Sequence, residues 1–115
     1  MRVLVFGAGV IGSLYAARLS SFGIDVALFA RGKRLETLKK KGLLYYEENT
    51  LKKASINIID KLENDDIYDY IFVAVRYEQV EGALMDIKGN HSKNTLSLEL
   101  PLTFRAIFNK ISIMF

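Results

Sequence analysis

Short, uninterrupted runs of apolar residues mark the strongest structural signals in this chain. They lie within residues 3–6, 25–30 and 70–75, and they are rich in Val, Ile, Leu and Phe. Continuous apolar runs of this length are typical of strands that are buried on both faces of a parallel sheet. The pattern therefore predicts three central strands.

Between these runs, apolar side chains recur every three or four residues, which is the spacing of one face of a helix. The spacing predicts helices over 10–23, 31–42 and 77–89, the first and last ending near Gly23 and Gly89. The positions that define them are Ile11, Leu14, Tyr15 and Leu19, then Leu35 and Leu38, and finally Val80, Leu84 and Ile87.

The remaining segments are shorter. Residues 43–48 and 54–59 predict two strands joined by a polar turn over 48–53, and the segment 94–100 predicts another strand that closes at Pro101. After Pro101, the apolar positions Phe104, Ile107, Phe108, Ile111 and Met114 predict an atypical C-terminal helix over 101–115.

Strands alternating with helices favour right-handed crossovers between parallel strands. We therefore expect an α/β fold of the Rossmann type, a doubly wound and mainly parallel sheet with helices on both faces. The chain has 115 residues and shows no internal repeat or linker, so a single domain over 1–115 is expected.

Composition removes several function classes. The net charge of +3 arises from 16 basic and 13 acidic residues, and the basic cluster at 31–42 carries no interleaved aromatics, so we expect no nucleic-acid binding. The chain has no Cys and a single His, so no metal site is expected. The apolar N-terminus is too short to span a membrane, which makes a cytoplasmic protein without membrane contact the default expectation.

The most specific motif is GAGVIG, in which Gly7, Gly9 and Gly12 directly follow the first predicted strand and open the first predicted helix. This is the context of a dinucleotide-binding fingerprint. Gly7 would allow the tight turn, Gly9 the close approach of a pyrophosphate, and Gly12 the close packing of helix and sheet. A purely structural turn is the alternative. The loop residues Ala8, Val10 and Ile11 are expected at the same cofactor site.

The end of the second strand predicts the cofactor type. NAD-preferring sites place an Asp or Glu there to hold the ribose 2′-hydroxyl. This chain has Arg31 instead, followed by Lys33 and Arg34. Because a guanidinium pairs well with a phosphate, Arg31 favours NADP(H) over NAD(H), the alternative being an exposed arginine at the start of a helix.

Four features together resemble the N-terminal domain of the ketopantoate reductase (2-dehydropantoate 2-reductase) family. They are VLVFGAGVIGSLYAARL, Arg31 at the end of a strand, KKKGL with Gly42, and DYIFVAVRYEQVEGAL, and the resemblance covers residues 1–98. It implies an oxidoreductase that uses NADPH to reduce ketopantoate, a 2-keto acid, on the pantothenate pathway. It also implies a Rossmann domain followed by a longer helical domain.

The same resemblance suggests site residues beyond the glycines and Arg31. Val75, Arg76 and Gln79 fall in the strand-to-helix turn that lines the family's cofactor cleft. Arg76 stands where the family has a lysine, and it cannot act as a titrating acid because it stays charged. No catalytic residue is therefore assigned, and a helix-capping surface turn is an equal alternative for Arg76 and Gln79.

Two departures from the family pattern bear on activity. The family's Asn-Gly pair is missing, because the chain reads Glu99, Leu100 and Pro101 there, and the helical domain is absent. We therefore expect the chain to be incomplete for catalysis by itself. The alternatives are a dinucleotide-sensing regulatory module and a catalytically degenerate remnant. If the apolar stripe over 104–114 is exposed, it predicts a homodimer.

Overall fold

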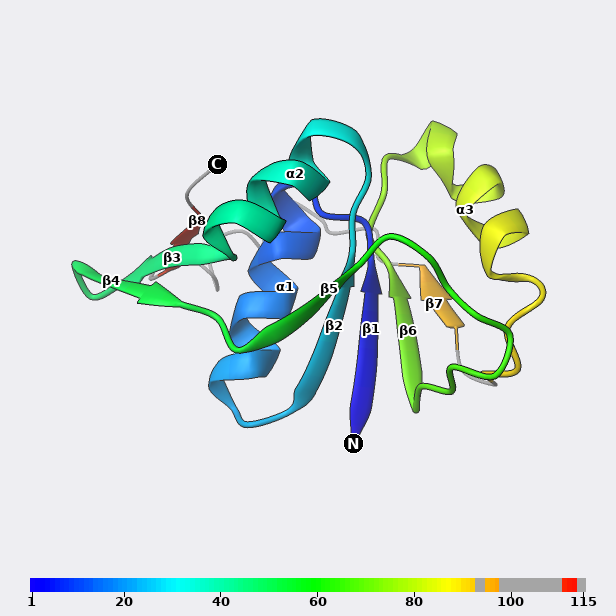
Figure 1. Cartoon of the computed structure of the whole chain (residues 1–115), viewed down its shortest axis with the longest axis horizontal. Coiled ribbons are helices and arrows are strands. Elements are labelled where there is room, and N and C mark those ends of the chain that lie inside the picture. The colour runs from blue at the N-terminus through cyan, green and yellow to red at the C-terminus, as the bar shows by residue number, and fades with distance from the viewer. Residues whose placement is uncertain (93–94, 98–110, 114–115) are drawn as a thin grey trace.

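The main sheet has five strands side by side, all parallel (Figure 1). The computed structural model describes residues 1–92, 95–97 and 111–113. The strands are β1 (Arg2–Phe6), β2 (Asp25–Phe29), β5 (Ile56–Ile59), β6 (Tyr70–Val73) and β7 (Thr95–Ser97), in the order β5-β2-β1-β6-β7. This is the strand order of a Rossmann sheet, which confirms the predicted fold class.

Among the residues that the structure describes, three helices cover the two faces of this sheet. The helices α1 (Val10–Ser21) and α2 (Gly32–Lys41) pack on one face, and α3 (Val80–Ile87), preceded by a 3-10 turn η1 (Tyr77–Gln79), packs on the other (Figure 1). Consecutive residues of β1 point to opposite faces, so Val3 and Val5 belong to the α1 side, whereas Leu4 and Phe6 belong to the α3 side. This two-sided burial explains the unbroken apolar runs in the sequence.

The helix α1 lies close to the sheet because its buried face consists of small residues. Gly12, Ser13, Ala16 and Ala17 are buried, while Leu14, Tyr15 and Leu19 pack at the margin of the core. The spacing of large apolar residues correctly predicted the helix but pointed to its flanks.

In α3, the buried residues are Ala83 and Ile87. Leu84, which the helical spacing placed on the core face, is 44% exposed.

A second, smaller sheet contains β4 (Thr50–Lys53), β3 (Leu44–Glu47) and β8 (Ile111–Ile113), all antiparallel. The turn between β3 and β4 needs only Glu48 and Asn49, both with positive φ, so residues 50–53 form a strand and the expected longer turn is wrong.

The helix expected over 101–115 is also wrong at Ile111–Ile113, which form a strand. The sequence Ile-Ser-Ile favours a strand, and the open edge of β3 supplies backbone partners. Residues 98–110 and 114–115, with most of the stripe on which the dimer prediction depends, lie outside the described residues. Within the described part of the chain, no helix is long and apolar enough to cross a membrane.

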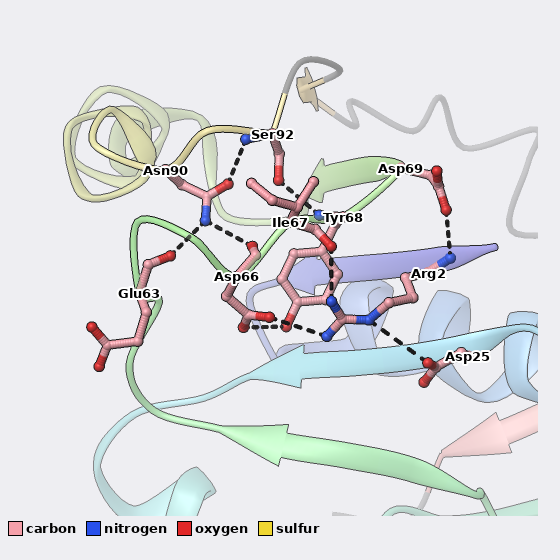
Figure 2. A network of polar contacts seen from close by, with 9 residues as sticks. All are labelled: Arg2, Asp25, Glu63, Asp66, Ile67, Tyr68, Asp69, Asn90 and Ser92. Carbon is pink, nitrogen blue, oxygen red and sulfur yellow. Dashed lines mark hydrogen bonds and ion pairs between the residues drawn. The ribbon is translucent and has the colours of Figure 1, made fainter.

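A polar network secures the amino-terminal edge of the main sheet (Figure 2). The Arg2 backbone N–H donates to the Asp69 carboxylate at 2.7 Å, and the Arg2 guanidinium donates to the Ile67 carbonyl at 2.8 Å and to Asp66 at 3.0 Å. The buried Tyr68 hydroxyl also donates to Asp66, at 2.8 Å. Burial and this hydrogen bond raise the pKa of Tyr68, and the hydrogen bond to Asp66 raises the pKa of Arg2.

The same network ties the loop between β5 and β6 to the end of α3. The Asn90 side-chain amide donates to the backbone carbonyls of Glu63 and Asp66, at 2.7 and 2.8 Å, and the Ser92 N–H donates to the Asn90 side-chain oxygen (Figure 2). The polar segment that leads into β6 is therefore an ordered part of the domain.

Candidate functional site

A cleft of about 1170 Å³ opens at the carboxyl ends of β1, β2 and β6. Its walls are formed by residues 6–11 after β1, 29–31 after β2, 74–76 after β6, and 78, 79, 82, 83 and 86 around η1 and α3, with Arg34 of α2. The chain leaves β1 toward one face of the sheet and leaves β6 toward the other. Ligands of open α/β sheets bind at such a reversal point.

The glycines that follow β1 have three different surroundings. Gly7 has φ +123°, and a Cβ there would lie 2.5 Å from the Ala74 carbonyl oxygen. A Cβ on Gly12 would lie 1.8 Å from the Gly7 carbonyl oxygen. Around Gly9, nothing lies within 4 Å of the Cβ position. Gly7 and Gly12 therefore let the turn and helix pack tightly, while Gly9 leaves its backbone open toward the cleft.

The N-terminus of α1 is suited to an anion. Gly9 is its N-cap and makes no side-chain capping bond, and its first turn contains no acidic residue. The first N–H groups of a helix have no partner within the helix, and the helix dipole favours negative charge near them. The loop and helix together fit a phosphate group bound through the backbone.

Arg31 reaches across the mouth of the cleft. It is the N-cap of α2, directly after β2, and its guanidinium lies over the rings of Phe29 and Phe6, at 5.1 and 6.0 Å from their centroids. It forms an ion pair with Asp86 of α3. The Arg31 side chain is 63% exposed, so this cation remains accessible to a ligand.

Arg34 lies one helical turn after Arg31 and contacts the glycine loop itself. Its Nε donates to the Ala8 carbonyl and its Nη2 donates to the Ser13 hydroxyl, both at 3.0 Å. Partial burial lowers the pKa of Arg34, although an arginine stays charged in proteins. Arg34 was not among the residues predicted for the site from the sequence, although its spacing of three residues from Arg31 was an available signal.

Arg76 and Gln79 form a turn that closes on itself. The Arg76 N–H donates to the Gln79 side-chain oxygen at 3.3 Å, and the Gln79 N–H donates to the Arg76 carbonyl at 2.8 Å. Both side chains are exposed and line the cleft next to Val75. The turn is thus a local cap and also a wall of the cleft.

Nine of the ten residues selected from the sequence line this cleft, namely Gly7, Ala8, Gly9, Val10, Ile11, Arg31, Val75, Arg76 and Gln79. Gly12 lies behind the loop instead. The lining also contains Phe6, Phe29, Arg34 and Asp86, which the sequence patterns did not predict. Three arginines face two carboxylates in this lining, a balance that suits an anionic ligand.

The family model of ketopantoate reductase PanE/ApbA matches residues 3–99. The chain belongs to the ketopantoate reductase family. A 2-dehydropantoate 2-reductase from Mesorhizobium japonicum is 32% identical over 96 residues, which cover 80% of this chain and 29% of the relative. One from Archaeoglobus fulgidus is 40% identical over 80 residues, covering 70% of this chain and 26% of the relative. This family member therefore spans less than a third of the length of these curated relatives.

The family assignment agrees with a likeness in three dimensions. The solved structure of D-mandelate dehydrogenase with NADH and anilino(oxo)acetate has a TM-score of 0.77 and 25% identity to this chain, and the match covers 96% of this chain and 37% of the dehydrogenase. The fold of this chain is thus shared with a dehydrogenase whose solved structure contains NADH.

Proposed function

We propose that this chain is the NADP(H)-binding part of an oxidoreductase that reduces a 2-keto acid. The observation that carries the proposal is the single cleft that holds the glycine loop, the uncapped start of α1 and the Arg31 guanidinium together at the carboxyl edge of the sheet. The cleft exceeds the roughly 300–1,000 Å³ of ordinary small-molecule pockets, so it has room for a dinucleotide.

Each part of the cleft has a partner on such a cofactor. The loop around Gly9 and the first N–H groups of α1 would hold the pyrophosphate. Arg31, which lies over the Phe29 and Phe6 rings at the ends of β2 and β1, would hold the adenosine end. The nicotinamide would face the turn at Val75 and Arg76, and when bound in reduced form it supplies the hydride for reduction.

Arg31 supports a preference for NADP(H). A 2′-phosphate offers the guanidinium a charged partner with several acceptor oxygens. A 2′-hydroxyl is uncharged, so Asp86 would then be the one charged partner of Arg31 among the described residues. The related D-mandelate dehydrogenase structure contains NADH. The preference in this chain is therefore argued from its own residues.

The substrate class comes from the relatives. Two of them are named 2-dehydropantoate 2-reductases, and the solved dehydrogenase holds a ligand with an oxoacetate group. Arg76 is an exposed cation beside the cleft, which would bind the carboxylate of a 2-keto acid. It would not donate the proton that the reduced ketone needs, because its guanidinium does not titrate near neutral pH.

The test compares NADPH and NADH binding, measured by calorimetry, for the parent chain and for Arg31→Ala. We expect Arg31→Ala to weaken NADPH binding about thirtyfold, the range for loss of a charge-assisted contact, and to leave NADH binding unchanged. Arg18→Ala is the matched control, because Arg18 lies on α1 with its guanidinium over the Phe22 ring. Equal NADPH affinity for the parent and Arg31→Ala would contradict the assignment.

A second candidate function is a binding module without catalysis. Arg76 in the place of the family lysine, within a turn that caps itself, favours it. Incubating the chain with NADPH and 2-dehydropantoate and following NADPH absorbance tests for catalysis directly. NADPH oxidation that depends on the keto acid would support the reductase and contradict the module. Binding of NADPH without its oxidation would show that the chain does not catalyse the reaction alone, which both the module and an incomplete reductase predict.

A further inference from the structure

We infer that Arg34 is a positioning residue that holds the glycine loop in the shape required for a pyrophosphate. The inference rests on the proposed function, because it assigns a separate task to a residue of the same site. Two arginines at the start of α2 would then have different tasks. Arg31 would bind the 2′-phosphate, and Arg34 would act on the pyrophosphate through the glycine loop.

The contacts of Arg34 form a closed triangle with the loop. The Ala8 carbonyl accepts from Arg34 Nε at 3.0 Å and from the Ser13 hydroxyl at 3.1 Å, and the Ser13 hydroxyl accepts from Arg34 Nη2 at 3.0 Å. Ser13 is completely buried. The planar guanidinium provides two donors in a fixed geometry, so it holds the loop carbonyl and the start of α1 at one relative position.

This triangle also orients the next backbone N–H. The peptide between Ala8 and Gly9 is planar and trans, so its carbonyl and its N–H point in opposite directions. Because the Ala8 carbonyl is held toward Arg34, the Gly9 N–H points away from Arg34. Gly9 lines the cleft and has open space around its Cβ position. Arg34 thereby prepares a backbone donor for the anion through the loop.

Loss of this contact should lower the affinity only for ligands that contain a pyrophosphate. Without Arg34, the Ala8 carbonyl still accepts a hydrogen bond from the Ser13 hydroxyl. This one hydrogen bond would leave the peptide between Ala8 and Gly9 free to change its orientation. A ligand with a pyrophosphate must then order the loop on binding, which lowers its affinity. A ligand that contains only the adenosine and its 2′-phosphate does not use the loop, so its affinity should not change.

The experiment measures the affinities of NADPH, NADH and adenosine 2′-monophosphate for the parent, Arg34→Met, Arg34→Lys and Arg31→Ala. We expect Arg34→Met to weaken NADPH and NADH equally, by about tenfold, the factor that corresponds to one hydrogen bond to a charged group. Adenosine 2′-monophosphate should bind it within about twofold of the parent. The dinucleotide affinities of Arg34→Lys should lie between those of the parent and those of Arg34→Met, because one ammonium cannot reproduce the two fixed donors of a guanidinium.

Lys33→Met is the control for charge, because Lys33 is the exposed neighbour of Arg34 on α2 and does not line the cleft. It should bind all three ligands like the parent. Arg31→Ala should also bind NADPH more weakly, but unlike Arg34→Met it should lose adenosine 2′-monophosphate and keep NADH. Far-ultraviolet circular dichroism and thermal unfolding of each variant report whether the fold is intact.

The inference is overturned if Arg34→Met binds both dinucleotides like the parent. It is also overturned if this variant loses adenosine 2′-monophosphate as strongly as NADPH, since Arg34 would then act on the whole site or on the 2′-phosphate. Failure of the proposed function looks different: the parent would bind no dinucleotide, or Arg31→Ala would keep its full NADPH affinity.

Discussion

Gly12 offers the sharpest test of how the glycine loop is built. Replacing it with Ala would place a Cβ 1.8 Å from the Gly7 carbonyl oxygen, against the 3.4 Å at which ordinary contact begins, and 3.3 Å from the Ala74 Cβ. Neither side can yield easily. Gly7 donates from its N–H to the Phe29 carbonyl at 3.2 Å, and α1 is packed against the sheet through its small buried residues.

We therefore expect Gly12→Ala to cost about 3 kcal/mol of folding free energy, the upper part of the usual range for overpacking. For a domain of this size, that corresponds to a fall of about 10 °C in the unfolding temperature, measured by circular dichroism. Gly9→Ala is the matched control, because the same methyl group meets nothing within 4 Å and the Gly9 φ of −72° suits alanine. It should unfold within about 2 °C of the parent.

The reasoning would be refuted if Gly12→Ala unfolded at the temperature of the parent. It would equally fail if Gly9→Ala lost as much stability as Gly12→Ala, because the cost would then follow from glycine in general and not from the closeness of the Gly7 carbonyl.

Three further predictions concern charged and titrating groups. Asp86→Asn removes the carboxylate that pairs with Arg31, so NADPH affinity should rise about threefold and NADH affinity should stay constant; a fall in NADPH affinity would contradict this. Asp66→Asn should lower the free energy of unfolding in urea by about 1–2 kcal/mol, because it disrupts the network of Figure 2, whereas Asp65→Asn, at a carboxylate 91% exposed, should not. The folded-state pKa of Tyr68 is raised above its ordinary 10.0, so its contribution to stability is present below about pH 10 and is lost as pH rises further. Tyr68→Phe should therefore show a shallower loss of stability over that alkaline range, and an unchanged slope would contradict the assignment.

Local signals in the chain were enough to predict the central architecture. The apolar runs at β1, β2 and β6 and the glycines after β1 depend on residues close together in sequence, and burial on both faces of a parallel sheet imposes just such runs. The same local logic placed Arg31 at the end of β2, beside the glycine loop, since the carboxyl ends of parallel strands meet at one edge.

Some local patterns were ambiguous because a short segment of sequence does not show which other part of the chain it will pack against. Residues 50–53 are polar and read as a turn, yet they form β4 because β3 lies beside them to complete a hairpin. Ile111 belongs to an apolar stripe that suits a helix, but Ile111–Ile113 pair with the free edge of β3. Leu84 has helical spacing but remains exposed. Tertiary context overrides propensity where a segment is short.

The sequence by itself therefore determined the central strands of the main sheet, the glycine turn after β1 and the family pattern, since each depends on neighbouring residues. Only the tertiary structure decided which distant side chains meet: Arg31 with Asp86, separated by 55 positions, and Arg34 with Ala8, separated by 26. These contacts depend on how closely α1 and α2 pack and on where α3 crosses the far face of the sheet. Such distances are properties of the packed core, which no single stretch of the chain encodes.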